Sequence, residues 1–167
     1  EGSSFGQIQQ QRRERQLVFG GGEVLLLMRQ LLPVLGVLHG KGLVHGDINP
    51  SNLLRRDQDG LPVLLDFGLL QNLGTAPLLG ATASYAPRGQ GRGEMAAPWM
   101  DLHALGVTAL TLLSGRAPEA LLPADASEWP CPPDLEIQSF QKTKNPSPGS
   151  MGIDSPNRAG AHITYGR

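Results

Sequence analysis

The residues best suited to chemistry lie between Leu43 and Gly68, which read LVHGDINPSNLLRRDQDGLPVLLDFG. Asp47 follows His45 by two residues, Asn52 follows that aspartate by five, and Asp66 ends a short apolar run. A carboxylate such as that of Asp47 can accept the proton of an attacking hydroxyl. An amide oxygen at Asn52 and a second carboxylate at Asp66 can bind a magnesium ion that neutralises charge on phosphates. The segment therefore contains the groups that phosphoryl transfer requires.

These groups act together only if the chain returns to one place, and the intervening sequence predicts how it does so. Residues 52–54 and 62–65 read Asn-Leu-Leu and Pro-Val-Leu-Leu, which is typical of short strands. Residues 57–60 join them and end in Asp-Gly, a strong signal for chain reversal. We expect this hairpin to deliver Asp66 beside Asn52.

An apolar helix is expected before the loop. Between Val24 and Leu38, apolar residues occupy nearly every face, which predicts a helix buried on most sides. Glu23 would lie at the positive end of its dipole. The apolar run is interrupted by Arg29 and Pro33 and falls short of the roughly 20 residues that span a bilayer. We therefore expect no membrane segment in this chain.

A second helix is expected from Asp101 to Ser114. Leucine and valine recur through this stretch, and Gly115 follows it, as is common at the carboxyl end of a helix. An aspartate at its start is also favoured by the helix dipole.

Composition limits the class of protein. With 40% hydrophobic residues, the 167-residue chain can form one modest domain. A formal net charge of -1 argues against nucleic acid as a partner. One cysteine, Cys131, excludes an internal disulfide and a cysteine-built zinc site. No basic segment leads into an apolar one near the start, so we expect no secretory signal and a cytoplasmic location.

The composition changes after about residue 130. Residues 131–167 are rich in proline, glycine and serine, and their few apolar side chains show no sustained periodicity. Such a segment cannot offset the entropy of ordering. We therefore expect a domain over residues 1–130 and a disordered tail over residues 131–167.

The joint pattern resembles the active-site signature of protein kinases, in particular the bacterial serine/threonine kinases. Its members are His45, Asp47, Asn52 and Asp66-Phe67-Gly68. Residues 69–90, which include Tyr85-Ala86-Pro87, resemble the activation segment and the substrate-docking turn. The helix from Asp101 is similar to the buried helix that organises the kinase catalytic lobe.

The resemblance implies a fold and a reaction. The fold is mainly α, that of the α+β kinase C-terminal lobe, with a small β-hairpin at the active site. Glu1-Gly2 resembles the end of the hinge between the two kinase lobes, so the N-terminal lobe with its glycine-rich loop is expected to be absent from this chain. The implied cofactors are ATP and Mg²⁺. The implied reaction transfers the terminal phosphoryl group to serine or threonine of a protein substrate.

Individual roles follow from the same resemblance. It implies catalytic roles for Asp47, Asn49 and Thr82, and cofactor binding by Asn52, Asp66, Phe67 and Gly68, with Asn52 and Asp66 as the metal ligands. Structural support is expected from His45, which braces the loop, and from Asp101. The carboxylate of Asp101 is expected to accept hydrogen bonds from backbone donors around His45.

Three departures from the kinase pattern predict an impaired or lost activity. Gly46 stands where many kinases have an arginine, so no cation is available there to bind a phosphorylated activation segment. Asn49 stands where a lysine commonly contacts the transferring phosphate, and it brings no charge. Gly89 replaces the glutamate that usually anchors the end of the activation segment.

Three other interpretations remain open at the level of sequence. The His-Gly-Asp triplet with Asn52 also resembles small-molecule phosphotransferases of the aminoglycoside and choline kinase type, although the long segment from Leu69 to Gln90 favours protein kinases. A non-catalytic pseudokinase module that binds a protein partner is a second alternative. A fragment without a stable fold is the third, because the absence of one lobe would expose apolar surface.

Overall fold

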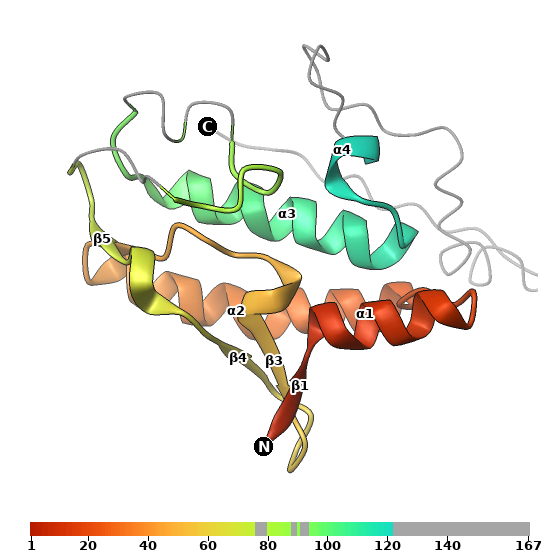
Figure 1. Cartoon of the computed structure of the whole chain (residues 1–167). Coiled ribbons are helices and arrows are strands. Elements are labelled where there is room, and N and C mark those ends of the chain that lie inside the picture. Colours follow the sequence, from red (N-terminus) through yellow and green to blue (C-terminus); the bar gives the residue numbers. More distant parts are fainter. Residues whose placement is uncertain (76–79, 88–89, 91–93, 122–167) are drawn as a thin grey trace, which may run out of the picture.

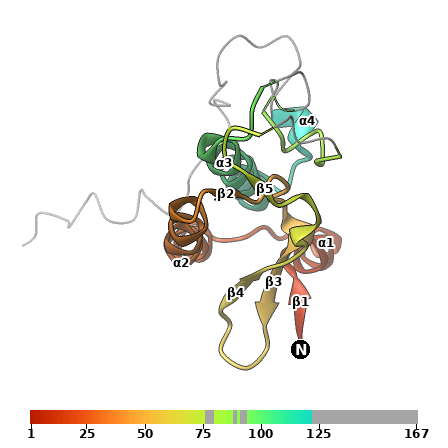
Figure 2. The ribbon, with the colours of Figure 1, turned by 90° about the vertical axis from the view of Figure 1, so that its left-hand side faces the viewer.

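Two long helices lie side by side at the centre of the molecule. The computed structural model describes residues 1–75, 80–87, 90 and 94–121, so the expected tail and Cys131 lie outside the described residues. Helix α2 (Gly21–Gly40) packs along α3 (Pro98–Ser114), and α1 (Phe5–Glu14) runs roughly parallel to both (Figure 1). Figure 2 views the helices nearly end-on, with the larger sheet on the side of α2 that faces α1. The described part is helix-rich, as predicted.

Helix α2 begins and ends where the local sequence favours it. Gly20 is the N-cap residue, and the Glu23 carboxylate accepts a hydrogen bond of 2.9 Å from the Gly20 amide. The helix continues through Pro33 and ends at Gly40, after which Gly42 adopts a left-handed conformation with φ 74°. Glycine reaches that conformation without steric cost.

The expectation that α2 is buried on most sides is wrong. Its buried residues form one stripe, spaced three and four apart: Val24, Leu27, Leu31 and Leu35. Five other apolar side chains are between 43% and 63% exposed: Leu25, Leu26, Leu32, Val34 and Val37. The physical reason is that the described elements packed most extensively on α2, namely α3, β2 and β4, leave the side chains outside this stripe exposed.

The length of α2 also differs from the expectation. The helix includes the glycines that flank the apolar run and so reaches 20 residues with a mean hydropathy of 1.5. By length and composition it could cross a bilayer, a test that the core helices of soluble proteins also pass. The helix therefore continues through Pro33 and reaches the length that the sequence analysis expected it to fall short of.

Helix α3 is the most buried helix. It begins with Pro98 in its first turn and is closed by Gly115, which has φ 66° and donates to the Thr111 carbonyl. Nine of its residues are buried, including Asp101. The short α4 (Pro118–Leu121) packs against it, as do α2 and β2 (Leu43–Val44). This packing on several sides explains why α3 buries more residues than α2.

Two small antiparallel sheets complete the fold. The predicted hairpin consists of β3 (Leu53–Arg56) and β4 (Pro62–Leu64), with Leu53 opposite Leu64. An additional strand that the sequence did not predict, β1 (Gly2–Ser4), pairs with β3. The second sheet joins β2 to β5 (Gln71–Asn72). Together the sheets hold the two ends of the loop that carries the candidate site.

An ion pair ties α1 to the start of α2. The Arg12 guanidinium contacts the Glu23 carboxylate at 2.7 Å and lies 4.1 Å from the centroid of the Phe19 ring. Phe19 in turn contacts Phe5 at the edge of the main core cluster. Arg12 therefore holds two helices through both its charge and its packing.

Candidate active site

The loop between β2 and β3 brings three of the predicted site residues together. The side-chain nitrogen Nδ2 of Asn52 donates to Asp47 Oδ2 at 2.9 Å, and the Thr82 backbone amide donates to Asp47 Oδ1 at 2.8 Å. Both carboxylate oxygens of Asp47 are thus held by neutral donors. The same nitrogen of Asn52 also donates to the Asp47 backbone carbonyl at 2.9 Å. These contacts orient the Asp47 carboxylate without an ion pair.

Asn49 lies inside the loop and uses its side chain there. It is 5% exposed, and its Oδ1 accepts from the backbone amides of Ser51 and Asn52, which caps the short 3₁₀ helix Pro50–Asn52. Its Nδ2 donates to the Asp47 carbonyl and to Thr82 Oγ1. An amide side chain has two donors and two acceptor positions. All four are occupied, so the side chain of Asn49 supports the loop.

His45 is buried and its hydrogen bonds define its tautomer. The Asp47 backbone amide donates to Nδ1 at 3.3 Å, and Nε2 lies 3.0 Å from the Leu65 carbonyl. Since a carbonyl only accepts, Nε2 is the donor in this contact, and Nδ1 accepts from the Asp47 amide. The Phe67 ring packs edge-on against it with centroids 5.2 Å apart. His45 therefore links the loop between β2 and β3 to the end of the hairpin.

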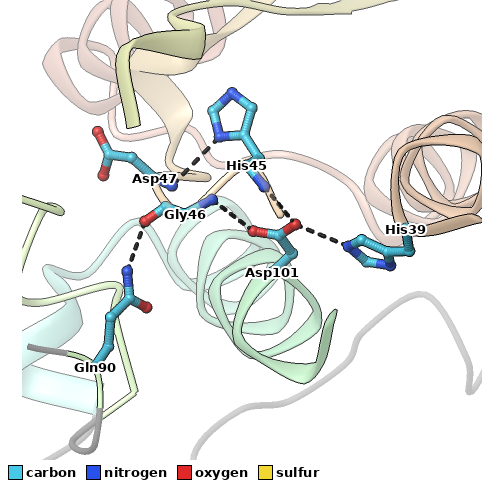
Figure 3. Close-up of polar contacts among 6 residues, drawn as sticks. All are labelled: His39, His45, Gly46, Asp47, Gln90 and Asp101. Atoms are coloured by element: carbon cyan, nitrogen blue, oxygen red, sulfur yellow. Dashed lines mark hydrogen bonds and ion pairs between the residues drawn. The ribbon is translucent and has the colours of Figure 1, made fainter. Parts of the chain in front are cut away.

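Asp101 receives hydrogen bonds from three donors (Figure 3). Its Oδ2 accepts from the His45 amide at 2.9 Å, and its Oδ1 accepts from the Gly46 amide at 2.8 Å. These are the backbone contacts that the sequence analysis expected. The third partner, His39 at the end of α2, lies 2.8 Å from Oδ2 through Nε2. This 1% exposed carboxylate therefore has a hydrogen-bond partner on each of its two oxygens.

Two residues of this network were missed by sequence reasoning. His39 lies 62 residues before Asp101, and no local pattern marks it. Gln90 donates from Nε2 to the Gly46 carbonyl at 2.7 Å across 44 residues. The only sequence signal near either contact is Gly46 itself, whose φ of 84° is a conformation that favours glycine.

A backbone hydrogen bond brings the chain next to the two predicted metal ligands together. The Leu65 amide donates to the Asn52 carbonyl at 2.8 Å, so Asp66 follows a residue paired with Asn52. Asp66 has φ 58°, is exposed, and accepts from the Gly68 amide at 3.1 Å. Within the described residues no group of three His, Cys, Asp or Glu side chains could hold a metal ion.

This donor set nevertheless suits Mg²⁺ shared with a phosphate ligand. Magnesium commonly takes one or two protein carboxylates, with water and phosphate oxygens completing its coordination. The Asn52 side chain donates to Asp47 through its nitrogen, which leaves its oxygen as a possible ligand. The Asp66 carboxylate is exposed and can accept a cation. The residues present therefore fit a magnesium ion bound together with phosphates.

A cavity of about 920 Å³ opens between the loop and α1. Asp47, Asn52 and Thr82 line it on the loop side. Polar residues line the α1 side: Gln7, Gln10, Arg13 and Glu14. Tyr85 also lines the cavity, and burial raises the pKa of its hydroxyl above the ordinary value. Asp47 thus faces a space that could hold an extended polar substrate.

The predicted replacement at Gly89 lies outside the described residues.

Comparison with known proteins identifies similar sequences and folds. The family model described as "Protein kinase domain" matches residues 2–128. Serine/threonine-protein kinase F of Synechocystis sp. is 40% identical over 114 residues, which cover 64% of this chain and 23% of that protein. Serine/threonine-protein kinase PknA of Nostoc sp. is 36% identical over 118 residues, which cover 65% and 21%. The chain thus spans less than a quarter of these relatives.

A solved structure shows the same fold. The Cydia pomonella granulovirus kinase PK-1 superposes with a TM-score of 0.61 at 23% sequence identity. The match covers 69% of this chain and 41% of that one.

Proposed function

Because this chain belongs to the protein kinase family, we propose that Asp47 and its neighbours serve the transfer of the terminal phosphoryl group of ATP to a serine or threonine hydroxyl of a protein. The observation that carries this proposal is the Asp47 carboxylate, held by the Asn52 side chain and the Thr82 amide beside a cavity. The serine/threonine kinases among its relatives support a protein substrate over an aminoglycoside or choline.

In this proposal Asp47 accepts the hydroxyl proton of the substrate. Each carboxylate oxygen has more than one lone pair, so the contacts to Asn52 and Thr82 leave acceptor capacity toward the cavity. The two donors limit rotation of the carboxylate, which keeps it aligned with an incoming hydroxyl. A base positioned in this way typically contributes a factor of about 10² to 10⁴ in rate.

Asn52 and Asp66 are proposed to hold Mg²⁺, which when bound would neutralise charge on the phosphates. Phe67 and Gly68 would act through Asp66. The Gly68 amide donates to its carboxylate, and the Phe67 ring rests against His45. These two contacts orient the turn that presents Asp66.

A low rate is part of the proposal. Asn49 is neutral, and its four hydrogen-bonding positions are used within the loop and on Thr82. It therefore adds no positive charge where charge develops on the transferring group.

We assign residues 1–130 to a helix-rich kinase lobe, the C-terminal one, and residues 131–167 to a tail.

The test is phosphotransfer from radiolabelled ATP to α-casein in the presence of Mg²⁺. Asp47→Asn removes the base while retaining shape, and we expect its rate to fall by about 10² to 10⁴. Asp57→Asn is the matched control, because Asp57 is an exposed aspartate on the hairpin turn. The proposal fails if Asp47→Asn and Asp57→Asn retain the same rate as the parent chain, or if the parent chain transfers no phosphate.

A further inference from the structure

The peptide groups on either side of Gly46 are held by two side chains from distant parts of the chain (Figure 3). The Gly46 amide donates to Asp101 Oδ1 at 2.8 Å, and its carbonyl accepts from Gln90 Nε2 at 2.7 Å. Gly46 is buried and has φ 84°. Glycine is the residue with the widest conformational freedom, so external contacts must hold this conformation. The Asp101 contact holds one peptide plane and the Gln90 contact holds the next.

The peptide plane held by Gln90 is the one that leads into Asp47. The Gly46 carbonyl and the Asp47 amide share a single planar peptide group. Rotation of that plane would also move the Asp47 amide, which donates to His45 Nδ1 at 3.3 Å. The Gln90 contact therefore acts on the backbone orientation of the proposed base.

Gln90 also belongs to the segment that contacts Asp47 directly. Its own amide donates to the Pro87 carbonyl at 3.0 Å, which links Gln90 to the described residues 80–87. Thr82 of the same segment donates to Asp47 Oδ1. The segment is therefore attached to the loop at three residues, Gly46, Asp47 and Asn49. All three hydrogen bonds use neutral N–H donors, so none requires a phosphate group or an arginine beside Asp47.

We propose that Gln90 is a positioning residue that, together with Thr82, seats residues 80–87 on the loop that carries Asp47, without phosphorylation, by holding the Gly46 carbonyl. This inference rests on the proposed function. Gln90 acts through the peptide group that joins Gly46 to Asp47 and does not touch the reacting atoms.

Gln90→Glu is the informative substitution. It keeps the length and shape of the side chain but replaces the N–H donor with a carboxylate oxygen, which the Gly46 carbonyl repels. Gln90→Met removes the donor without adding charge. The matched control is Gln58→Glu, because Gln58 is exposed on the turn of the β3–β4 hairpin.

The first measurement is amide hydrogen exchange by NMR on the full chain, which does not depend on catalysis. In Gln90→Glu and Gln90→Met we expect the Gly46 and Asp47 amides to exchange about two- to twelvefold faster, the factor that one net hydrogen bond represents. The amide of Leu112 in α3 reports global unfolding and should not change. The second measurement is steady-state kinetics, in which kcat should fall and KM for ATP should stay constant.

The outcomes separate the two proposals. Unchanged exchange rates at Gly46 and Asp47 in both Gln90 variants would overturn the positioning role. Exchange at Gly46 and Asp47 that accelerates by the same factor as at Leu112 would also overturn it, because the change would then be global unfolding. If the parent chain transfers no phosphate, the proposed function fails, while the exchange result still decides the role of Gln90. Gln58→Glu should match the parent in every measurement.

Discussion

Replacing Asp101 with asparagine gives a direct measure of how firmly α3 holds the loop that carries Asp47. Asp101 is 1% exposed and accepts from the Gly46 amide through one oxygen, and from the His45 amide and the His39 ring through the other. Asparagine has nearly the same shape but replaces one acceptor with an NH₂ donor. The least damaging orientation of the asparagine side chain keeps its oxygen toward the His45 amide and the His39 ring, and turns its NH₂ group toward the Gly46 amide.

The magnitude follows from that orientation. The Gly46 amide is left buried without an acceptor, which costs about 1–3 kcal/mol, and the remaining two hydrogen bonds lose their charged partner. We therefore expect Asp101→Asn to lower the free energy of unfolding by about 2–4 kcal/mol. Asp101→Ala would strand all three donors and is expected to prevent stable folding.

The assay is urea denaturation followed by circular dichroism. Asp101→Asn should lower the denaturation midpoint without changing the m-value, whereas Asp57→Asn, on the exposed turn, should have no effect. A double-mutant cycle with His39→Ala should show coupling, since the two side chains are in contact. A loss below about 0.5 kcal/mol for Asp101→Asn, the range of ordinary surface changes, would refute the reasoning.

Two further predictions concern α2. The hydrogen bond from Arg12 lowers the pKa of Glu23 to about 2, from 4.5 in the unfolded chain. Its stabilising contribution is therefore complete above pH 4.5 and is lost as the pH falls toward 2. Because the Glu23 side chain is about half exposed, we expect Glu23→Gln to lower the free energy of unfolding by less than about 1 kcal/mol. Thermal melts across this pH range measure the loss. If the stability of the variant depends on pH as strongly as that of the parent chain, the assignment to Glu23 is contradicted. Leu35→Ala, at 1% exposure, should cost about 2–5 kcal/mol, whereas Val37→Ala, at 63%, should stay within about 0.5 kcal/mol. Equal losses for these two variants would show that the face of α2 carrying Val37 is covered.

Local features were predictable from the sequence for a physical reason. The contact between Asn52 and Asp47 spans five residues, and the cap by Asn49 spans two and three. The turn in the β3–β4 hairpin depends on Asp-Gly chemistry within four residues. Such interactions are encoded by residue type and spacing, so the order of residues along the chain was enough to identify the pattern around Asp47.

The tertiary structure decided the contacts that join distant segments. Helix α2 is apolar on nearly every face, so its periodicity could not indicate that the stripe containing Leu35 is buried while Val37 is exposed. Strand β1 is only three residues long, and its pairing with β3 depends on a partner about 50 residues away. His39 and Gln90 are ordinary polar residues in the sequence. They become part of the site because folding brings one to Asp101 and the other to Gly46, and a hydrogen bond across 62 or 44 residues leaves no local pattern.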